Sequence, residues 1–272
     1  MSSRFRFHGH AIGAGGRIHH PFNEFVEIQA ASALPEVGGH GSATSSNFRY
    51  RNILRFDHAH TEVTGSQTNG PDGKPVHKSL IRSSVEGLDI MGMVTADRVE
   101  LRLVSFTDGE PEPCFKFTGS HFENLKIAGV PVKVHLAVDV FDRLHKHRDL
   151  LKSYRAKEEF HSLYHKATLK DTLKKAPERI QRWFQGPPEK GADLPHVEGV
   201  TRVSLLRQLE PETPVFKCWG HVIYIEGFGT IHLAEVHVSK HKRSVTMVRV
   251  ELGSPVDGSL DVGTGSAGGS PY

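Results

Sequence analysis

The chain has 272 residues, enough for one large β domain or two smaller domains. A chain of this length can bury a core that needs no disulfides or metal ions for its stability. Lys and Arg number 34 against 31 Asp and Glu, and 37% of the residues are hydrophobic, an ordinary globular balance that argues against a chain that is disordered throughout. A formal charge of +3 gives nucleic-acid binding no support by itself, and we do not expect it.

The number of cysteines and the length of the apolar runs limit the cellular locations that the sequence suggests. Cys114 and Cys218 allow one disulfide at most and establish no disulfide framework. The N-terminal residues lack the apolar stretch of a secretory signal, and no apolar run reaches the roughly 18 residues of a membrane span. We therefore expect no membrane span and a cytoplasmic protein, with the cell surface or the extracellular space as the alternative.

An imperfect internal repeat, called the echo below, is the clearest feature of the sequence. The segment Ser84–Gly92 returns as Ser120–Gly129, with Val85 falling on Phe122 after 122 − 85 = 37 residues. The same interval separates further apolar residues: Phe48 from Val85, and Ile53, Ile90 and Ile127 from one another. Repetition at a fixed interval predicts similar β units that bury their apolar faces against one another. Leu88 and Leu125 should then be buried in comparable strand environments.

Strand patterns dominate the first half of the chain. Glycines divide residues 5–63 into short segments, of which 25–28 and 52–56 are the clearest strands, and the Asn-Gly and Asp-Gly steps in 65–74 predict a hairpin or loop. Residues 94–104 form the best strand pattern in the chain, which predicts a sheet with one solvated face. Val99, Leu101 and Leu103 lie on one side of this strand, and Arg98, Glu100 and Arg102 on the other.

The second half of the chain begins with a change in amino-acid composition. Residues 141–184 contain no glycine and are rich in Lys, Arg, Glu, Leu and His, which favours two or three short helices, and 186–195 is typical of a linker. Strands are then predicted at 201–206, 220–225, 229–238 and 244–252. In the last of these we expect Thr246, Val248, Val250 and Leu252 to face the core.

Together these patterns predict a mainly β protein, a β-sandwich or layered β-fold with internal strand repeats and an α-helical insertion. The predicted divisions are a first part of the β body at 1–136, a helical insertion and linker at 137–195, closing strands at 196–262, and a flexible or partner-ordered tail at 263–272, which is rich in Gly and Ser.

Histidines are the abundant reactive side chains. His8 and His10, and likewise His58 and His60, are spaced so that both rings of a pair lie on one side of a strand and offer two imidazoles to a divalent metal ion. The alternative is that these are exposed strand histidines without a ligand. Glu158, His161 and His165 have helical spacing suited to Zn²⁺, yet the residues between the histidines supply no general base, and a solvated helix face is the favoured alternative.

No pattern in the sequence supports a catalytic residue. The glycines at 9–16 lack the Lys-Ser/Thr of a phosphate loop, no serine lies in a Gly-x-Ser-x-Gly elbow, and neither cysteine has a nucleophile-like context. We therefore predict no cofactor other than a possible divalent metal.

Several short segments resemble choice-of-anchor-type β-rich bacterial surface proteins in their order. They are Ser84–Val99, Ser120–Val132, Gly227–Leu233 and Val245–Leu252, which cover about a quarter of the chain. The resemblance implies a non-catalytic, surface-displayed β protein. The sequence departs from that pattern because it has no sorting signal or anchor and carries a basic helical segment.

The leading functional hypothesis is a non-catalytic structural protein that associates with copies of itself into an oligomer or polymer, since exposed strand edges make such pairing available. The expected interface residues are Phe160, Trp183, Phe184 and Tyr272. The alternative is a metal-dependent β-fold enzyme or a metal-binding protein that uses the His-x-His pairs.

Overall fold

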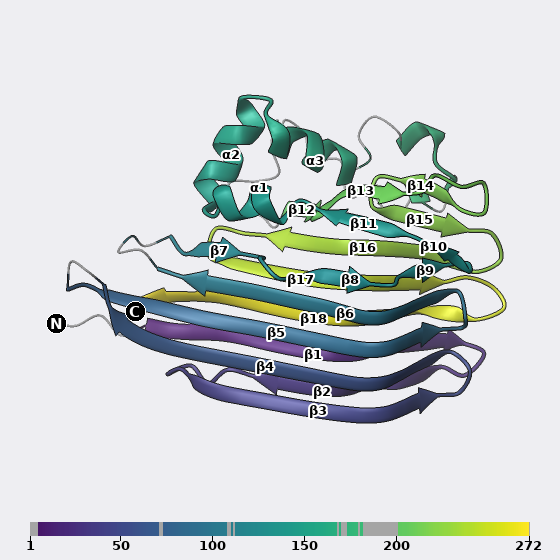
Figure 1. Cartoon of the computed structure of the whole chain (residues 1–272), viewed down its shortest axis with the longest axis horizontal. Coiled ribbons are helices and arrows are strands. Elements are labelled where there is room, and N and C mark those ends of the chain that lie inside the picture. The colour runs from purple at the N-terminus through teal and green to yellow at the C-terminus, as the bar shows by residue number, and fades with distance from the viewer. Residues whose placement is uncertain are drawn as a thin grey trace.

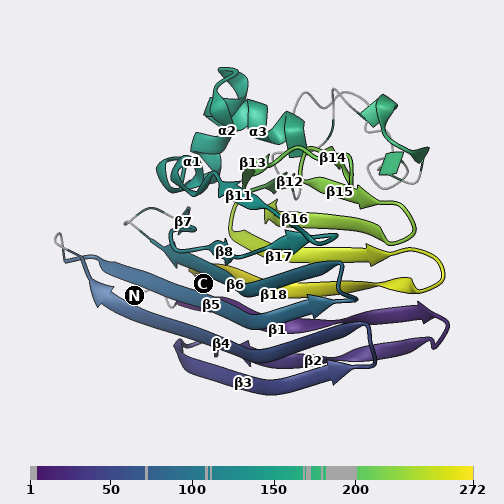
Figure 2. The same cartoon turned by 45° about the vertical axis from the view of Figure 1, so that its right-hand side comes forward.

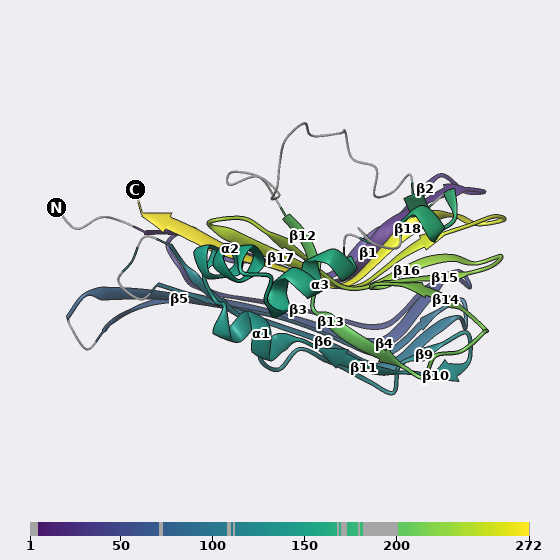
Figure 3. The same ribbon diagram turned by 90° about the horizontal axis from the view of Figure 1, so that it is seen from above.

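The computed structural model describes residues 5–70, 73–107, 110, 112–167, 169, 173–178, 180–181 and 201–271. Two antiparallel sheets lie face to face, and helices cover one end of the sandwich (Figure 1). The view from above shows the two sheets as separate layers (Figure 3). The predicted mainly β, layered fold is confirmed.

Sheet A contains the first and the last strand of the chain. Its strands follow the order β14 (Lys217–Trp219), β15 (Val222–Ile225), β16 (Gly229–Val238), β17 (Lys242–Leu252), β18 (Asp257–Pro271), β1 (Phe5–His20) and β2 (Glu24–Ala33), and β12 (Thr201–Ser204) also pairs with β16.

Sheet B is built from consecutive hairpins. Its order is β10 (Val130–Pro131), β9 (Lys126–Ile127), β6 (Val94–Phe106), β5 (Pro75–Ile90), β4 (Leu54–Asn69) and β3 (Gly39–Tyr50), while β7 (Cys114–Lys116) and β8 (His121–Glu123) pair with β6. A separate two-stranded sheet joins β11 (Lys133–Leu136) to β13 (Leu206–Glu210).

The core lies between the two sheets, where their alternating apolar side chains meet. The predicted alternation of β6 is confirmed, because Val99, Leu101 and Leu103 are fully buried in this core. On the opposite face of β6, Glu100 forms an ion pair with Arg82 of the neighbouring strand.

The predicted helical insertion contains α1 (Val138–Arg143), α2 (His147–Arg155), α3 (Glu159–Ala167) and the 3₁₀ turn η1 (Leu173–Lys175). The ring of Phe141 contacts Phe117 and Phe160 edge to face, with centroids 5.5 and 5.9 Å apart. Phe160 is therefore buried between the helices and the sheet, which corrects its expected role at an interface. Trp183, Phe184 and Tyr272 lie outside the described residues.

The C-terminal segment is not the predicted flexible tail. Residues up to Pro271 belong to β18, which pairs with both β1 and β17 in the interior of sheet A. Its small residues allow a close approach of the sheets: a Cβ on Gly265 would lie 2.7 Å from Cδ2 of Leu101 and 3.0 Å from Cγ2 of Ile81. The glycines here serve packing rather than flexibility.

In each sheet, five irregular residues lie side by side on neighbouring segments of the chain and form a row across the sheet. The ladder pairing of the strands is interrupted at this row. In sheet B the row is Asn47, Asp57, Gly87, Asp97 and Asn124, and in sheet A it is Ala30, Gly13, Gly263, Met247 and Ala234. On alternate strands of each row the residue has a positive φ. Side-chain alternation shifts by one residue at each row, as it does at a β-bulge. The long strands of sheet B bend together in Figures 1 and 2.

The rows explain the sequence echo. Gly87 and Asn124 are equivalent members of the sheet B row, and Met91 and Ala128 begin equivalent turns with φ of 54° and 50°. Leu88 and Leu125 are both buried, as predicted, although Leu125 lies between β8 and β9.

A third copy of the echo, suggested by Phe48 and Ile53 at the same interval, is shifted. The turn equivalent to the one at Met91 begins at Arg51, so its interval is 91 − 51 = 40 residues instead of 37. Phe48 therefore corresponds to Leu88 and not to Val85. Each is the first residue after the row in its hairpin: Phe48 pairs with Phe56, and Leu88 pairs with Ala96.

The row in sheet A also corrects the predicted facing of β17. Val248, Val250 and Leu252 face the core as expected, but Thr246 pairs with Glu235 and lies on the opposite face. The irregular position of Met247 between them reverses the alternation, so Val245 is the buried residue on the other side of the row.

The packing role of β18 is testable at Gly265. We expect Gly265→Val to lower the free energy of unfolding by about 1–3 kcal/mol, because the added methyl groups meet Leu101 and Ile81 in a filled core. Urea unfolding measures this change, with Ser270→Val in the half-exposed part of the same strand as the control. Equal stability of Gly265→Val and the wild type would show that this segment does not pack between the sheets.

Candidate functional site

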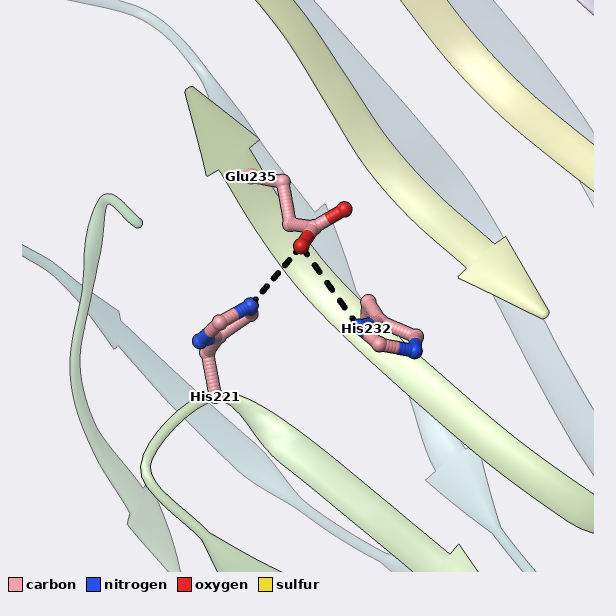
Figure 4. Close-up of side chains that lie close together, drawn as sticks. All are labelled: His221, His232 and Glu235. Atoms are coloured by element: carbon pink, nitrogen blue, oxygen red, sulfur yellow. Dashed lines mark hydrogen bonds and ion pairs between the residues drawn. The ribbon is translucent and has the colours of Figure 1, made fainter. Parts of the chain in front are cut away.

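His221, His232 and Glu235 meet at one buried point on the face of sheet A that points away from the sandwich core. His221 directly precedes β15, and the other two residues lie on β16 (Figure 4). Oε1 of Glu235 lies 3.0 Å from Nε2 of His221 and 3.5 Å from Nδ1 of His232. Each of the three side chains is 1–2% exposed, so the cluster is closed to solvent.

The irregular residue Ala234 brings His232 and Glu235 together. In a regular strand, residues three apart point to opposite faces of the sheet. Ala234 has a φ of 50°, and its place in the row shifts the alternation so that both side chains reach the same face. On the other side of the cluster, the N–H of Leu233 donates to the carbonyl of His221 over 3.1 Å, which fixes the start of β15 beside β16.

The second carboxylate oxygen of Glu235 has its own partner. A guanidinium N–H of Arg249, on the adjacent strand β17, donates to Oε2 of Glu235, so the two oxygens of this carboxylate have separate roles. Nε of Arg249 lies 3.8 Å from Oε1 of Glu251. Nε2 of His232 is 3.4 Å from the hydroxyl of Thr230, which orients the ring.

Burial and neighbouring charges set the ionisation of the cluster. Burial lowers the pKa of His232 to about 4, so its imidazole is neutral at pH 7. Burial acts to raise the pKa of Glu235, but hydrogen bonds from His221 and His232 outweigh it and hold this pKa far below its ordinary value. The site therefore combines a buried carboxylate anion with a neutral imidazole.

The spacing of the three side chains is compatible with a shared metal ion. Ligand atoms around a tetrahedral Zn²⁺ ion, bound at about 2.0–2.1 Å, are separated by about 3.3 Å. The separations of 3.0 and 3.5 Å at Oε1 of Glu235 bracket that value, and the three ligand atoms all lie within 4.8 Å of one another. Two imidazoles and one carboxylate form a ligand set that zinc and other first-row metals use in proteins.

The histidine pairs singled out in the sequence lie elsewhere and apart from each other. His8 and His10 are on β1 of sheet A, whereas His58 and His60 are on β4 of sheet B. All four belong to the polar faces of their strands, and Nδ1 of His58 is 3.0 Å from the hydroxyl of Ser46. Within the described part of the chain, neither pair joins a group of three or more metal-ligating side chains, and the His221 cluster does.

The helical candidates also remain separate from this cluster. His161 and His165 lie on α3 and their rings stack, with centroids 4.0 Å apart. The nearby ring of Tyr154 is 5.0 Å from that of His161.

The cluster was missed in the sequence for a physical reason. His232 and Glu235 have a spacing that places them on opposite faces of a regular strand. A glycine or asparagine at 234 would have indicated a left-handed residue, but alanine rarely adopts this conformation and gives no such signal. His221 is a single histidine that only the pairing of β15 with β16 brings within reach.

Comparisons with known proteins give a family but no activity. A family model described as "Domain of unknown function (DUF8256)" matches residues 5–239. No curated protein and no solved structure matches the chain. The resemblance to choice-of-anchor-type proteins therefore stays a prediction. In the described part of the chain, no helix has the length and apolar character needed to cross a membrane.

Burial of His232 predicts a pH-dependent stability in the metal-free protein. Its pKa of about 4 in the folded state lies below the ordinary value of 6.5, so the unfolded chain binds a proton first as the pH falls. The stabilisation from this residue is complete above the unfolded pKa and is lost as the pH falls from about 6.5 to 4, with a cost of about 2 kcal/mol between pH 7 and 5.

Urea unfolding at pH 7 and pH 5 in the presence of a chelator measures this loss. His232→Gln should show a smaller difference between the two pH values than the wild type, whereas His8→Gln, at an exposed position of β1, should not. An unchanged pH dependence in His232→Gln would show that His232 is not held neutral.

Proposed function

The chain belongs to the DUF8256 family, and we propose that it is a metal-binding β-sandwich protein that holds one divalent transition-metal ion between His221, His232 and Glu235. The observation that supports this most is the spacing of the three ligand atoms, because they lie close enough to share one ion. In this assignment His221 binds through Nε2, His232 through Nδ1 and Glu235 through Oε1.

The surroundings of the cluster suit such an ion. Arg249 donates to the oxygen of Glu235 that does not face the histidines, and it therefore orients the carboxylate without occupying the ligand atom. The hydroxyl of Thr230 stands in the same relation to the second nitrogen of His232. Partners of this kind commonly fix the orientation of metal ligands.

Zn²⁺ is the ion that the donor set fits best. Two imidazoles and one carboxylate supply three ligands of the nitrogen and oxygen type, with no thiolate in the cluster. A hard ion such as Mg²⁺ or Ca²⁺ prefers oxygen ligands and more of them. Three protein ligands leave a fourth position for water or a small ligand.

The proposed role is binding rather than turnover. All three side chains are almost fully buried, so a bound ion would be shielded from bulk solvent. The ion would join the start of β15 to the centre of β16 and would stabilise the folded state, because the unfolded chain lacks a preformed site.

Metal analysis of protein purified without an affinity tag tests this proposal. We expect about one zinc per chain after zinc loading and dialysis, and a gain of about 2.7 kcal/mol in unfolding free energy when free zinc is 100 times the dissociation constant. His221→Gln and His232→Gln should each weaken zinc binding by at least about tenfold.

Two kinds of control separate ligand loss from other effects. His147→Gln changes another buried histidine, which is 5% exposed and lies outside the cluster, and it should leave the stoichiometry unchanged. His10→Gln and His60→Gln test the pairs predicted from sequence. The proposal is wrong if the folded wild type binds no metal, or if only the substitutions at His10 or His60 remove it.

A further inference from the structure

Exposed apolar side chains gather along one edge of the sandwich. The described residues include six large hydrophobic side chains that are exposed, and four of them lie between residues 22 and 37: Phe22, Phe25, Ile28 and Val37. Phe25 is 74% exposed and Val37 is 88% exposed. These residues flank or belong to β2, the last strand of sheet A. They are spread along this strand and its flanking loops, and the guanidinium groups of Arg51 and Arg17 lie over the rings of Phe22 and Phe25 at 3.6 and 4.8 Å from the ring centroids.

The same side of the molecule carries the last strand of sheet B. β3 lies beside β2 at the lower edge in Figures 1 and 2 and forms ladder pairs with β4 on one side only, as far as the described residues extend. None of its twelve residues is buried. The backbone N–H and C=O groups along its outer side are therefore a template for another strand.

The usual protections against strand pairing are missing from the first part of β3, from Gly39 to Ser46. Edge strands of monomeric proteins are commonly short, bulged, or interrupted by Lys or Pro. The sequence Gly39–Tyr50 contains neither, and its central residues from Gly41 to Ser46 are small and uncharged. The row residue Asn47 comes after this run and leaves it regular from Gly39 to Ser46.

Side-chain contacts hold the two edge strands in place. The hydroxyl of Ser45 donates to Oε1 of Gln29 over 2.7 Å in the middle of the edge. At one end, the hydroxyl of Tyr50 donates to Oε2 of Glu24 over 2.7 Å, and Arg51 forms an ion pair with the same carboxylate. A preordered edge loses less entropy when it binds a partner.

We propose that this edge is the contact between two copies of the chain, which pair β3 to β3 in antiparallel orientation about a two-fold axis near Thr44. The charge distribution along β3 favours a second copy of the chain as the partner. The neutral run from Gly41 to Ser46 meets an identical neutral run, so no like charges oppose each other at the axis. The two B sheets become one continuous sheet. The exposed apolar residues along β2 then lie beside the contact and add buried area to the hydrogen-bonded strands.

Sedimentation equilibrium of the full-length protein over a concentration series tests the contact. We expect a monomer–dimer equilibrium. Thr44→Glu should raise the dimer dissociation constant by about tenfold or more, since two carboxylates then face each other near the axis. Gln67→Glu adds the same charge at an exposed position of β4 beyond the end of β3, and it should leave the constant unchanged.

A second variant keeps the test independent of the folding of Thr44→Glu. Phe25→Ser removes the most exposed apolar ring of β2, so its effect on folding should be small, and it should weaken the dimer by about three- to tenfold. A wild type that stays monomeric at every concentration would overturn the proposal, and such a result would leave a peptide from another protein as the partner of this edge. Open-ended polymers, or a dimer that both variants leave unchanged, would overturn it equally.

Discussion

One interruption of strand alternation, repeated across neighbouring strands, controls much of this structure. In each sheet, five residues at one level fall out of the pairing ladder, and positive φ angles occur on alternate strands. A single irregular residue in one strand would leave its neighbour out of register, so the irregularity must be matched from strand to strand. The rows satisfy this requirement and keep both core faces apolar on either side of the level.

The proposed metal site is a direct consequence of the same constraint. Ala234 is the member of the sheet A row on β16, and it alone places Glu235 on the face that His232 already occupies. Its partner in the row, Met247, acts likewise on β17 and brings Arg249 to the face where it meets Glu235. The buried carboxylate then has a charged partner, as a buried anion needs.

The sequence predicted the parts of the fold that depend on regular alternation. The apolar face of β6 follows from its local alternation, and the helical insertion follows from the glycine-free composition of residues 141–184. The strand at the C-terminus was not, because Gly and Ser are typical of linkers and only the distance between the two sheets gives them a packing role. The echo is visible in the sequence, yet its third copy, at Phe48 and Ile53, is misaligned there by three residues, since turn geometry and not side-chain identity defines the repeat.

The candidate site was beyond sequence reasoning for a similar reason. His-x-His pairs are visible in a sequence because a strand brings i and i+2 together, whereas His232 and Glu235 require a left-handed alanine and His221 requires a tertiary contact. Metal binding thus stays a proposal, but with residues other than the His-x-His pairs. Self-association also stays a proposal, now at the edge strand β3.

The central claim is that His221, His232 and Glu235 share one ion, and zinc K-edge X-ray absorption of the zinc-loaded protein tests it most directly. The account predicts nitrogen and oxygen scatterers at about 2.0–2.2 Å with the outer-shell scattering of two imidazoles. A sulfur scatterer at about 2.3 Å, or a shell of oxygens without imidazole scattering, would contradict it.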